Sequence, residues 1–223
     1  MDNFDMRHLL LSCIAFFGAC AETSKETKEA HFDAYVRFME EEASLKAEAT
    51  IKENDQPIEI PGGISYLEVS MNLMPIRGVT YKIEYPSGYR PEHSFVWKDF
   101  KGRGQKFDFR MAPVTAFAFS PQAPSRSQPA TFRWEGGPAE KGEVFVFMWE
   151  NPELGLTIPM EVIPGIGQSY IDFPATKMSM LSPGEWTLYL VRKKLSKGML
   201  ANQTACTGIS EYYTIKQALT ILP

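Results

Sequence analysis

The sequence predicts an all-β protein with two β-sandwich domains, which follow a signal peptide and a short polar, partly helical N-terminal segment. Three observations support this fold class. Runs of alternating apolar and polar residues recur at short intervals after residue 44, with Gly, Pro, Asn and Ser between them. Long helical stretches are missing from the same part of the sequence, as is typical of sandwiches and small barrels. A break rich in proline and serine at 121–129 divides the runs into two series.

The first series predicts a β-sandwich domain over 32–120. An i, i+3, i+4, i+7 spacing of apolar residues predicts one or two helical turns at its start, at Phe32, Tyr35, Val36 and Met39. Strict alternation over 45–51 then predicts a half-buried strand. Further strands are expected in the sequences ISYLEVSMNLM, VTYKIEY, SFVWKDF, QKFDFRM and VTAFAFSP.

The sequence PQAPSRSQP at 121–129 predicts a linker, and a second sandwich domain is expected over 130–223. Its strands are expected in ATFRWEG, EVFVFMWEN, TIPMEVI, SYIDFPA, EWTLYLVRK and SEYYTIKQALTI. EVFVFMWEN is apolar on both faces, which predicts a strand that is central to the sandwich or lies against a neighbouring domain. Pro159 within TIPMEVI predicts an edge strand or a bulge.

One local pattern resembles a known fold family. The sequence LSPGEWTLYLV at 181–191 places a leucine and a Pro-Gly turn before an aromatic residue and a strand. This resembles the turn and corner of fibronectin type III and related immunoglobulin-like modules, and implies that the sandwiches are immunoglobulin-like. Trp186 stands at the aromatic position, where its indole N–H is expected to reach a backbone carbonyl. The resemblance concerns architecture and implies no activity.

The first residues predict export. MDNFDMRHLLLSCIAFFGAC contains an uncharged apolar run over 9–17, and two small residues stand directly before Cys20. This run is far shorter than the roughly 20 residues of a transmembrane helix, and the pattern is typical of a secretory signal peptide over 1–19. It resembles the lipobox of bacterial lipoproteins, which implies that Cys20 is the lipidation site and the new N-terminus.

Residues 20–31 are polar and mixed in charge, so we expect a flexible spacer behind the lipid. Translation from Met6 would leave a shorter signal with a net positive charge. Two alternatives to the lipoprotein interpretation are an ordinary signal peptide with a chance cysteine and a buried N-terminal helix of a cytoplasmic protein.

Charge and composition argue against a nucleic-acid partner. Removal of the signal leaves 22 basic and 25 acidic residues, whereas nucleic-acid binding needs a clustered basic face. The basic clusters at 98–106 and 192–197 are small and are expected to lie in loops or at strand ends.

No recognisable catalytic or metal-binding constellation is present in the sequence, so we expect no enzymatic activity, no cofactor and no metal. The mature chain has two histidines, His31 and His93, and both are expected to be solvated. Cys206 would have no disulfide partner once Cys13 is removed and Cys20 carries lipid, and it is expected to be a buried apolar residue.

The aromatic residues of the strands provide the candidate ligand-binding positions. An exposed row of them on a sandwich face would stack on sugar rings, although strand aromatics usually pack in the core. The candidates are Trp149, Tyr89 and Tyr213. Adjacent residues of a strand face opposite ways, so one of Tyr212 and Tyr213 is expected to be exposed.

The sequence as a whole is similar to lipoproteins of Bacteroidota-type bacteria, with a short signal, a polar spacer and aromatic-rich sandwiches. We therefore expect a membrane-anchored, non-enzymatic lipoprotein that acts as a binding or envelope-assembly module. It would be an outer-membrane lipoprotein of the cell envelope that faces the periplasm or the cell surface. Its partners would be the membrane, through the lipid, and an envelope protein or a glycan. One alternative is a carbohydrate-binding surface lipoprotein, and a second is a hydrolase whose site is not visible in the sequence.

Overall fold

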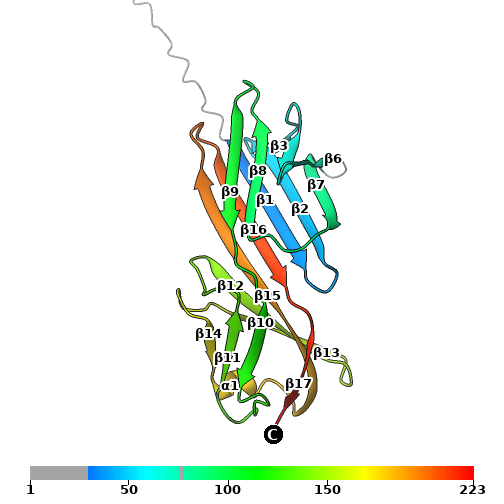
Figure 1. Cartoon of the computed structure of the whole chain (residues 1–223), viewed down its shortest axis with the longest axis vertical. Coiled ribbons are helices and arrows are strands. Elements are labelled where there is room, and N and C mark those ends of the chain that lie inside the picture. The colour runs from blue at the N-terminus through cyan, green and yellow to red at the C-terminus, as the bar shows by residue number, and fades with distance from the viewer. Residues whose placement is uncertain (1–29, 76–77) are drawn as a thin grey trace, which may run out of the picture.

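The computed structural model describes residues 30–75 and 78–223, and this part of the chain is almost entirely β-structure (Figure 1). Within these ranges the sole helix is the four-residue α1 (Ala175–Met178). The predicted all-β class is therefore confirmed. The strands form one large sheet and two small ones that pack against it.

The large sheet has ten strands in the order β13-β12-β15-β16-β1-β2-β7-β6, with β17 paired to β15 and β3 paired to β2. All of its neighbouring strands are antiparallel except β1 and β16, which are parallel. Its members are β1 (Ala30–Met39), β2 (Ser44–Glu53), β3 (Gln56–Ile58), β6 (Asn72–Met74), β7 (Thr80–Pro86), β12 (Glu143–Asn151), β13 (Leu156–Val162), β15 (Gly184–Met199), β16 (Ala205–Tyr213) and β17 (Gln217–Ile221).

The two small sheets cover different parts of the large one. The first has the order β5-β4-β8-β9 and consists of β4 (Ile64–Tyr66), β5 (Val69–Ser70), β8 (Glu92–Lys98) and β9 (Gly104–Arg110). The second has the order β10-β11-β14 and consists of β10 (Ala116–Ser120), β11 (Ala130–Glu135) and β14 (Tyr170–Phe173).

Aromatic side chains fill the space between the layers. At the first small sheet, the rings of Phe32 on β1 and Trp97 on β8 stack with centroids 4.3 Å apart. At the second, Phe132 on β11 meets Phe147 on β12 edge to face at 4.7 Å. These side chains are buried because alternate residues of each strand point inward, so the core follows directly from the period-two pattern.

The strand β15 gives the molecule its elongated shape. It runs for 16 residues and pairs with β17 over 184–188, with β12 over 187–194 and with β16 over 191–199. Residue 30 and the C-terminus therefore lie at opposite ends of the molecule (Figure 1).

The large sheet also crosses the predicted boundary at 121–129. The strand β1, from the first predicted domain, pairs with β16, from the second, over nine residues. Residues of the predicted linker contact the end of the chain, where the amide of Arg126 donates to the carbonyl of Leu222 at 2.9 Å. The two halves are thus joined by continuous hydrogen bonding, and their division into separate domains stays a prediction.

The helical turns predicted near the start are wrong, because residues 30–39 form the strand β1. Phe32, Ala34, Val36 and Phe38 point into the core, so the true period is two. The helical spacing arose because Tyr35 and Met39 are apolar residues on the opposite face. Pairing with β2 on one side and β16 on the other provides hydrogen-bond partners for the backbone of β1. This tertiary context overrides the helical spacing of the apolar residues. β1 also includes the last two residues of the predicted spacer.

Other local predictions are confirmed. β12 lies between β13 and β15, as its apolar faces indicated. Pro159 lies on β13, an edge strand, where its missing N–H breaks no ladder. The indole N–H of Trp186 donates to the carbonyl of Ser182 at 2.9 Å, which is the backbone contact expected at the corner.

Candidate functional site

The face of the large sheet that points away from the two small sheets, here the outer face, is rich in polar and aromatic side chains. Tyr35 and Arg37 of β1 point to this face, between buried residues that point inward. The strand register places Arg37 opposite Glu211 of β16, which in turn lies opposite Lys193 of β15. Charges of opposite sign therefore alternate across three adjacent strands, an arrangement that stabilises the sheet.

Glu211 lies at the centre of a hydrogen-bonded cluster on the outer face, and its side chain is only 11% exposed. The Tyr35 hydroxyl donates to its Oε2 at 2.5 Å, and the Tyr213 hydroxyl donates to the same oxygen at 3.0 Å. Nζ of Lys193 lies 3.5 Å from Oε1. The two tyrosines reach one carboxylate because Tyr35 is a diagonal neighbour of Glu211 across the β1–β16 pair, and Tyr213 lies two residues further along β16 on the same face.

The Arg37 guanidinium lies between the two tyrosine rings, 5.4 Å from the centroid of Tyr35 and 5.2 Å from that of Tyr213. Its Nε also donates to the Tyr35 hydroxyl at 2.7 Å. Burial and then the Glu211 carboxylate raise the pKa of Tyr213 to about 12 and also raise the pKa of Tyr35. Both phenols therefore stay protonated at neutral pH and hold the cluster in a fixed arrangement.

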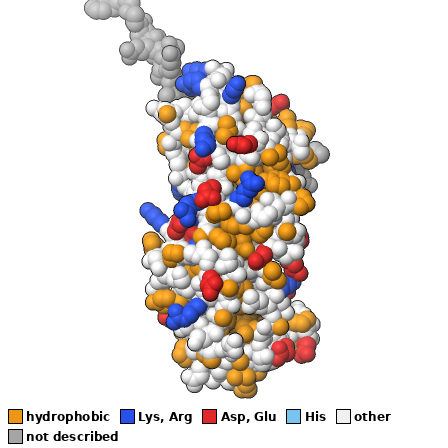
Figure 2. Space-filling view, viewed as in Figure 1, with side chains coloured by type: hydrophobic (Ala, Val, Ile, Leu, Met, Phe, Trp, Pro, Cys, Tyr) orange, Lys and Arg blue, Asp and Glu red, His pale blue; other side chains and the backbone are white. Residues whose placement is uncertain are grey.

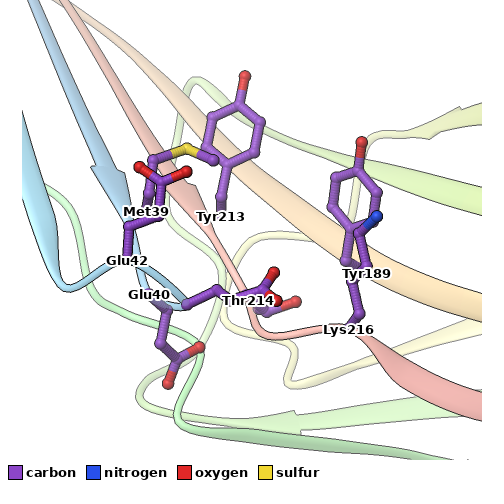
Figure 3. A pocket seen from close by; sticks show the side chains of 8 residues that line it. Met39, Glu40, Glu42, Tyr189, Tyr213, Thr214 and Lys216 are labelled. Atoms are coloured by element: carbon purple, nitrogen blue, oxygen red, sulfur yellow. The ribbon is translucent and has the colours of Figure 1, made fainter.

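A hollow of about 300 Å³ opens beside this cluster, where the β1–β2 turn approaches the connection between β16 and β17 (Figure 3). The rings of Tyr213 and Tyr189 stand on neighbouring strands and extend in the same direction. Carboxylates from the turn and one lysine complete the hollow. Its lining residues are Met39, Glu40, Glu41, Glu42, Tyr189, Tyr213, Thr214 and Lys216.

The hollow carries more negative than positive charge. Nζ of Lys216 lies 2.8 Å from Oε2 of Glu150 and 5.4 Å from the centroid of the Tyr189 ring. The hydrogen bond to Glu150 raises the pKa of Lys216, so this ammonium stays charged. Glu40 accepts a hydrogen bond from the amide of Ile215 at 3.1 Å. Glu41 and Glu42 are exposed and, among the described residues, form no ion pair within 4 Å. The hollow thus presents aromatic surface and hydrogen-bond acceptors.

A second, shallower hollow of about 260 Å³ lies further along the outer face, over β1, β2 and β16. Hydroxyl groups of Thr50, Thr80, Thr207 and Tyr35 line it together with Asp33 and Glu48. Both carboxylates are already paired, Asp33 with Lys52 at 2.8 Å and Glu48 with Lys82 at 2.9 Å. This hollow therefore combines hydroxyl-bearing residues with apolar surface from Ala34, Ala49 and Ile209.

The structure separates the three predicted ligand-binding aromatics. Tyr213 is half-exposed and lines the first hollow, and its neighbour Tyr212 is buried, as alternation predicted. Tyr89 is mostly covered, and its hydroxyl donates to the carbonyl of Met111 at 2.7 Å. Trp149 is fully buried and packs against Trp186, so the expectation that it faces outward is wrong. On β12 the core takes the face with the larger rings, and Met148 faces outward instead.

His93 is not the solvated loop residue that the sequence predicted. It lies on β8 with 1% of its surface exposed, and its Nδ1 is 2.9 Å from the Tyr66 hydroxyl. Burial lowers the pKa of His93 to about 4, so it is neutral at physiological pH. Neither hollow includes it. Cys206 is buried as predicted, and burial raises the pKa of its thiol to about 11.

Four residues of the outer-face site were missed by the sequence analysis: Tyr35, Arg37, Glu211 and Tyr189. The available signal was the alternation in HFDAYVRFM, which assigns Tyr35 and Arg37 to one face once the period is taken as two. Glu211 meets them through parallel pairing of strands 176 residues apart, for which local sequence carries no signal.

Cys20 lies outside the described residues. In the part that is described, no helix is long and apolar enough to cross a membrane. Across the same residues, no group of three or more His, Cys, Asp and Glu side chains is placed to hold a metal ion.

Comparison with known proteins gives no family. No family model matches the chain, and no curated protein matches it. Among solved structures, it is similar to dimeric latent PorU from Porphyromonas gingivalis, with 11% identity over 92% of this chain and 21% of that chain, at a TM-score of 0.27. It is also similar to fibronectin(III)-like modules of CbhA from Clostridium thermocellum, with 10% identity over 84% of this chain and 94% of that chain, at a TM-score of 0.23. The chain thus spans about a fifth of the PorU chain, and at these scores neither likeness carries information about function.

Proposed function

We propose that this protein is a non-enzymatic binding module of the cell envelope, tethered to the outer membrane by lipid on Cys20 and facing the periplasm or the cell surface. The observation that carries the binding role is the hollow on the outer face, which Tyr213 and Tyr189 line together with Glu41 and Glu42. Its shape depends on paired strands and on the fixed cluster around Glu211, so the surface is largely formed before a ligand arrives.

The chemistry of the hollow favours a ligand that donates hydrogen bonds. Carboxylates accept from hydroxyl and ammonium groups, and tyrosine rings attract both cations and the C–H faces of sugars. Lys216 already places an ammonium over the Tyr189 ring, which illustrates the kind of group that fits there. A basic side chain of an envelope protein is therefore our first candidate ligand.

The non-enzymatic role is supported by the placement of the reactive side chains. His93 and Cys206 are in the core and line neither hollow, and Cys206 has a raised thiol pKa. The carboxylates of the second hollow are held in ion pairs with lysines.

Capture of partners from solubilised envelope tests the binding role. Tyr213→Ala removes one wall of the hollow, and Tyr170→Ala on β14 is a matched control, since Tyr170 is an exposed tyrosine outside both hollows. We expect a purified partner identified with the wild-type chain to bind the Tyr213 variant at least tenfold more weakly, the loss of about 1.4 kcal/mol or more that is typical of a central aromatic contact. Equal loss in both variants, or in neither, would reject the hollow as the binding site.

The tether is tested separately. Replacement of Cys20 by Ser is expected to release the protein from the membrane fraction and to abolish incorporation of labelled palmitate. Unchanged partition and labelling would show that the lipoprotein interpretation is wrong.

A glycan ligand is the second candidate, and the second hollow favours it. Threonine hydroxyls and the Tyr35 ring there continue the outer face beyond the Glu211 cluster, so an extended sugar chain would contact both hollows. Titration with neutral oligosaccharides of increasing length distinguishes this candidate. Affinity that rises with chain length and falls in Tyr213→Ala supports it, whereas no binding at millimolar concentration excludes it.

A further inference from the structure

We infer that two hairpin tips at the end of the molecule next to residue 30 form a membrane-contact surface that inserts Phe100 and Met199 among lipids. Each tip is a turn with strand residues that flank it: residues 98–106 around the β8–β9 turn, and residues 196–204 around the β15–β16 turn (Figure 1). The inference rests on the proposed tether for its orientation, but its test does not depend on the tether.

Both tips lie beside the first residues of β1. The strand register pairs Met199 with Ala205, and Ala205 pairs with His31. The other hairpin is held at the same level, because Trp97 and Phe107, on its two strands, both contact the ring of Phe32. The two turns therefore lie together at one end of the molecule.

The tips expose large apolar side chains. Phe100 is 60% exposed and Met199 is 68% exposed, although each residue belongs to a tight turn or a strand end with ordered neighbours. The amide of Gly102 donates to the carbonyl of Asp99 at 2.8 Å, and the amide of Gln203 donates to the carbonyl of Leu200 at 2.9 Å. Singly exposed apolar residues are common on protein surfaces, so the position of these two beside the first residues of β1 and among basic side chains is what points to a membrane contact.

Charge at the tips fits anionic lipid headgroups. The two tips contain five basic residues, Lys98, Lys101, Arg103, Lys106 and Lys197, and one acidic residue, Asp99. Asp99 is paired with Arg103 at 2.7 Å, and Lys106 is paired with Asp108 of β9 at 2.8 Å. Within the described residues, the remaining three lysines have no carboxylate within 4 Å. Figure 2 shows basic side chains at this end of the molecule. The nearby β2–β3 turn carries Asp55, so we assign the contact to the two hairpins alone.

The length of the chain before β1 favours lipid over any other occupant. Nine residues separate Cys20 from Ala30, and a chain of that length spans at most about 35 Å. A lipid on Cys20 would therefore hold this end, and not the opposite one, within reach of the bilayer. Basic and apolar residues close to a lipid anchor add to the membrane affinity that one anchor provides.

Depth-dependent fluorescence tests the inference on the full chain purified from membranes and reconstituted into vesicles that contain phosphatidylglycerol with brominated acyl chains. The native tryptophans are buried and emit in every variant, so the quenching in excess of that of the wild-type chain reports on a tryptophan introduced by Phe100→Trp. Met180→Trp is the matched control, because Met180 is 52% exposed and follows α1 near the opposite end. We expect bromine to quench the emission at position 100 and to leave that at position 180 unchanged.

A second measurement tests the charges. Lys101→Gln should weaken binding of externally added anionic vesicles about fivefold, as expected for one basic residue near a lipid surface, with no change for Lys141→Gln outside the tips.

A purified chain that carries no lipid would reject the proposed tether. The inference would then be tested by adding the brominated vesicles to that chain and measuring the quenching at position 100. Absence of quenching at position 100, or equal quenching at 180, would overturn it. The inference would also be overturned if Phe100→Ser bound vesicles as the wild-type chain does but lost its binding to a protein partner.

Discussion

Arg192 and Glu143 form an ion pair in which neither side chain is exposed to solvent, with Nη2 and Oε2 2.7 Å apart. The guanidinium also donates to the carbonyls of Pro113, Gly137 and Pro138, at 3.0, 3.2 and 2.8 Å. Pro113 lies where the chain passes from the first small sheet to the second. One buried side chain of β15 thus fastens the crossover, the β11–β12 loop and the start of β12.

Removal of this arginine should strongly destabilise the fold. We expect Arg192→Met to lower the free energy of unfolding by about 3–5 kcal/mol, because Glu143 would be left as an unpaired buried charge and the carbonyls of Pro113 and Pro138 would lose a donor. Urea denaturation measures the change. Arg103→Met breaks the exposed pair with Asp99 and should cost less than about 1 kcal/mol. If the free energy of unfolding fell by similar amounts in the two variants, burial would not explain the importance of the Arg192–Glu143 pair.

His93 should make the protein less stable in mild acid. Its pKa is about 4 in the folded state and near 6.5 in the unfolded state, so the unfolded chain binds the proton first as the pH falls. Stability is therefore full above pH 6.5 and declines between pH 6.5 and 4, by roughly 2–3 kcal/mol. Among the residues that the structure describes, the neutral groups Tyr66 and Tyr89 and apolar rings such as Phe109 face the imidazole, and no carboxylate there offsets the loss.

The comparison for this prediction is His93→Gln, measured by urea denaturation at intervals from pH 7 to pH 5. The wild-type chain should lose stability more steeply than the variant over this range. Parallel curves would show that His93 is not responsible.

Gly208 should not tolerate a side chain. A Cβ atom at this position of β16 would lie 2.8 Å from Cε1 of Phe109, so the aromatic ring packs directly on the glycine backbone. We expect Gly208→Ala to lower the melting temperature, with a cost of about 1–3 kcal/mol from overpacking. Gly104→Ala is the control, because nothing lies within 4 Å of its Cβ position. If Phe109→Leu restores stability when it is combined with Gly208→Ala, the steric cause is confirmed. If stability is not restored, contact with the Phe109 ring is not the cause.

Cys206 should be unreactive until the protein unfolds. The thiol is 2% exposed, and burial raises its pKa to about 11, so little thiolate forms at neutral pH. In a chain with Cys13 and Cys20 replaced by serine, a thiol reagent at pH 7.5 should label less than about a tenth of the protein in the time that labels a urea-unfolded sample completely. Equal rates in the two samples would show that the site opens readily.

The sequence by itself determined the all-β class, because alternation, turn residues and prolines are local signals of strands and their ends. It also determined the central position of EVFVFMWEN and the corner at Trp186, where pattern and structure agree. Among the candidate site residues, it identified Tyr213 through the opposed faces of two adjacent tyrosines. The lipidation of Cys20 rests on sequence alone and stays a prediction.

Only the tertiary structure decided which apolar face became the core. Trp149 and Met148 lie on opposite faces of one strand, and the sheets packed against β12 put the larger ring inside. The same holds for His93, which polar neighbours suggested was solvated and which packing buried. The Glu211 cluster depends on parallel pairing between β1 and β16. Long-range pairing is selected by the fit of whole layers, and no short window of residues contains that information.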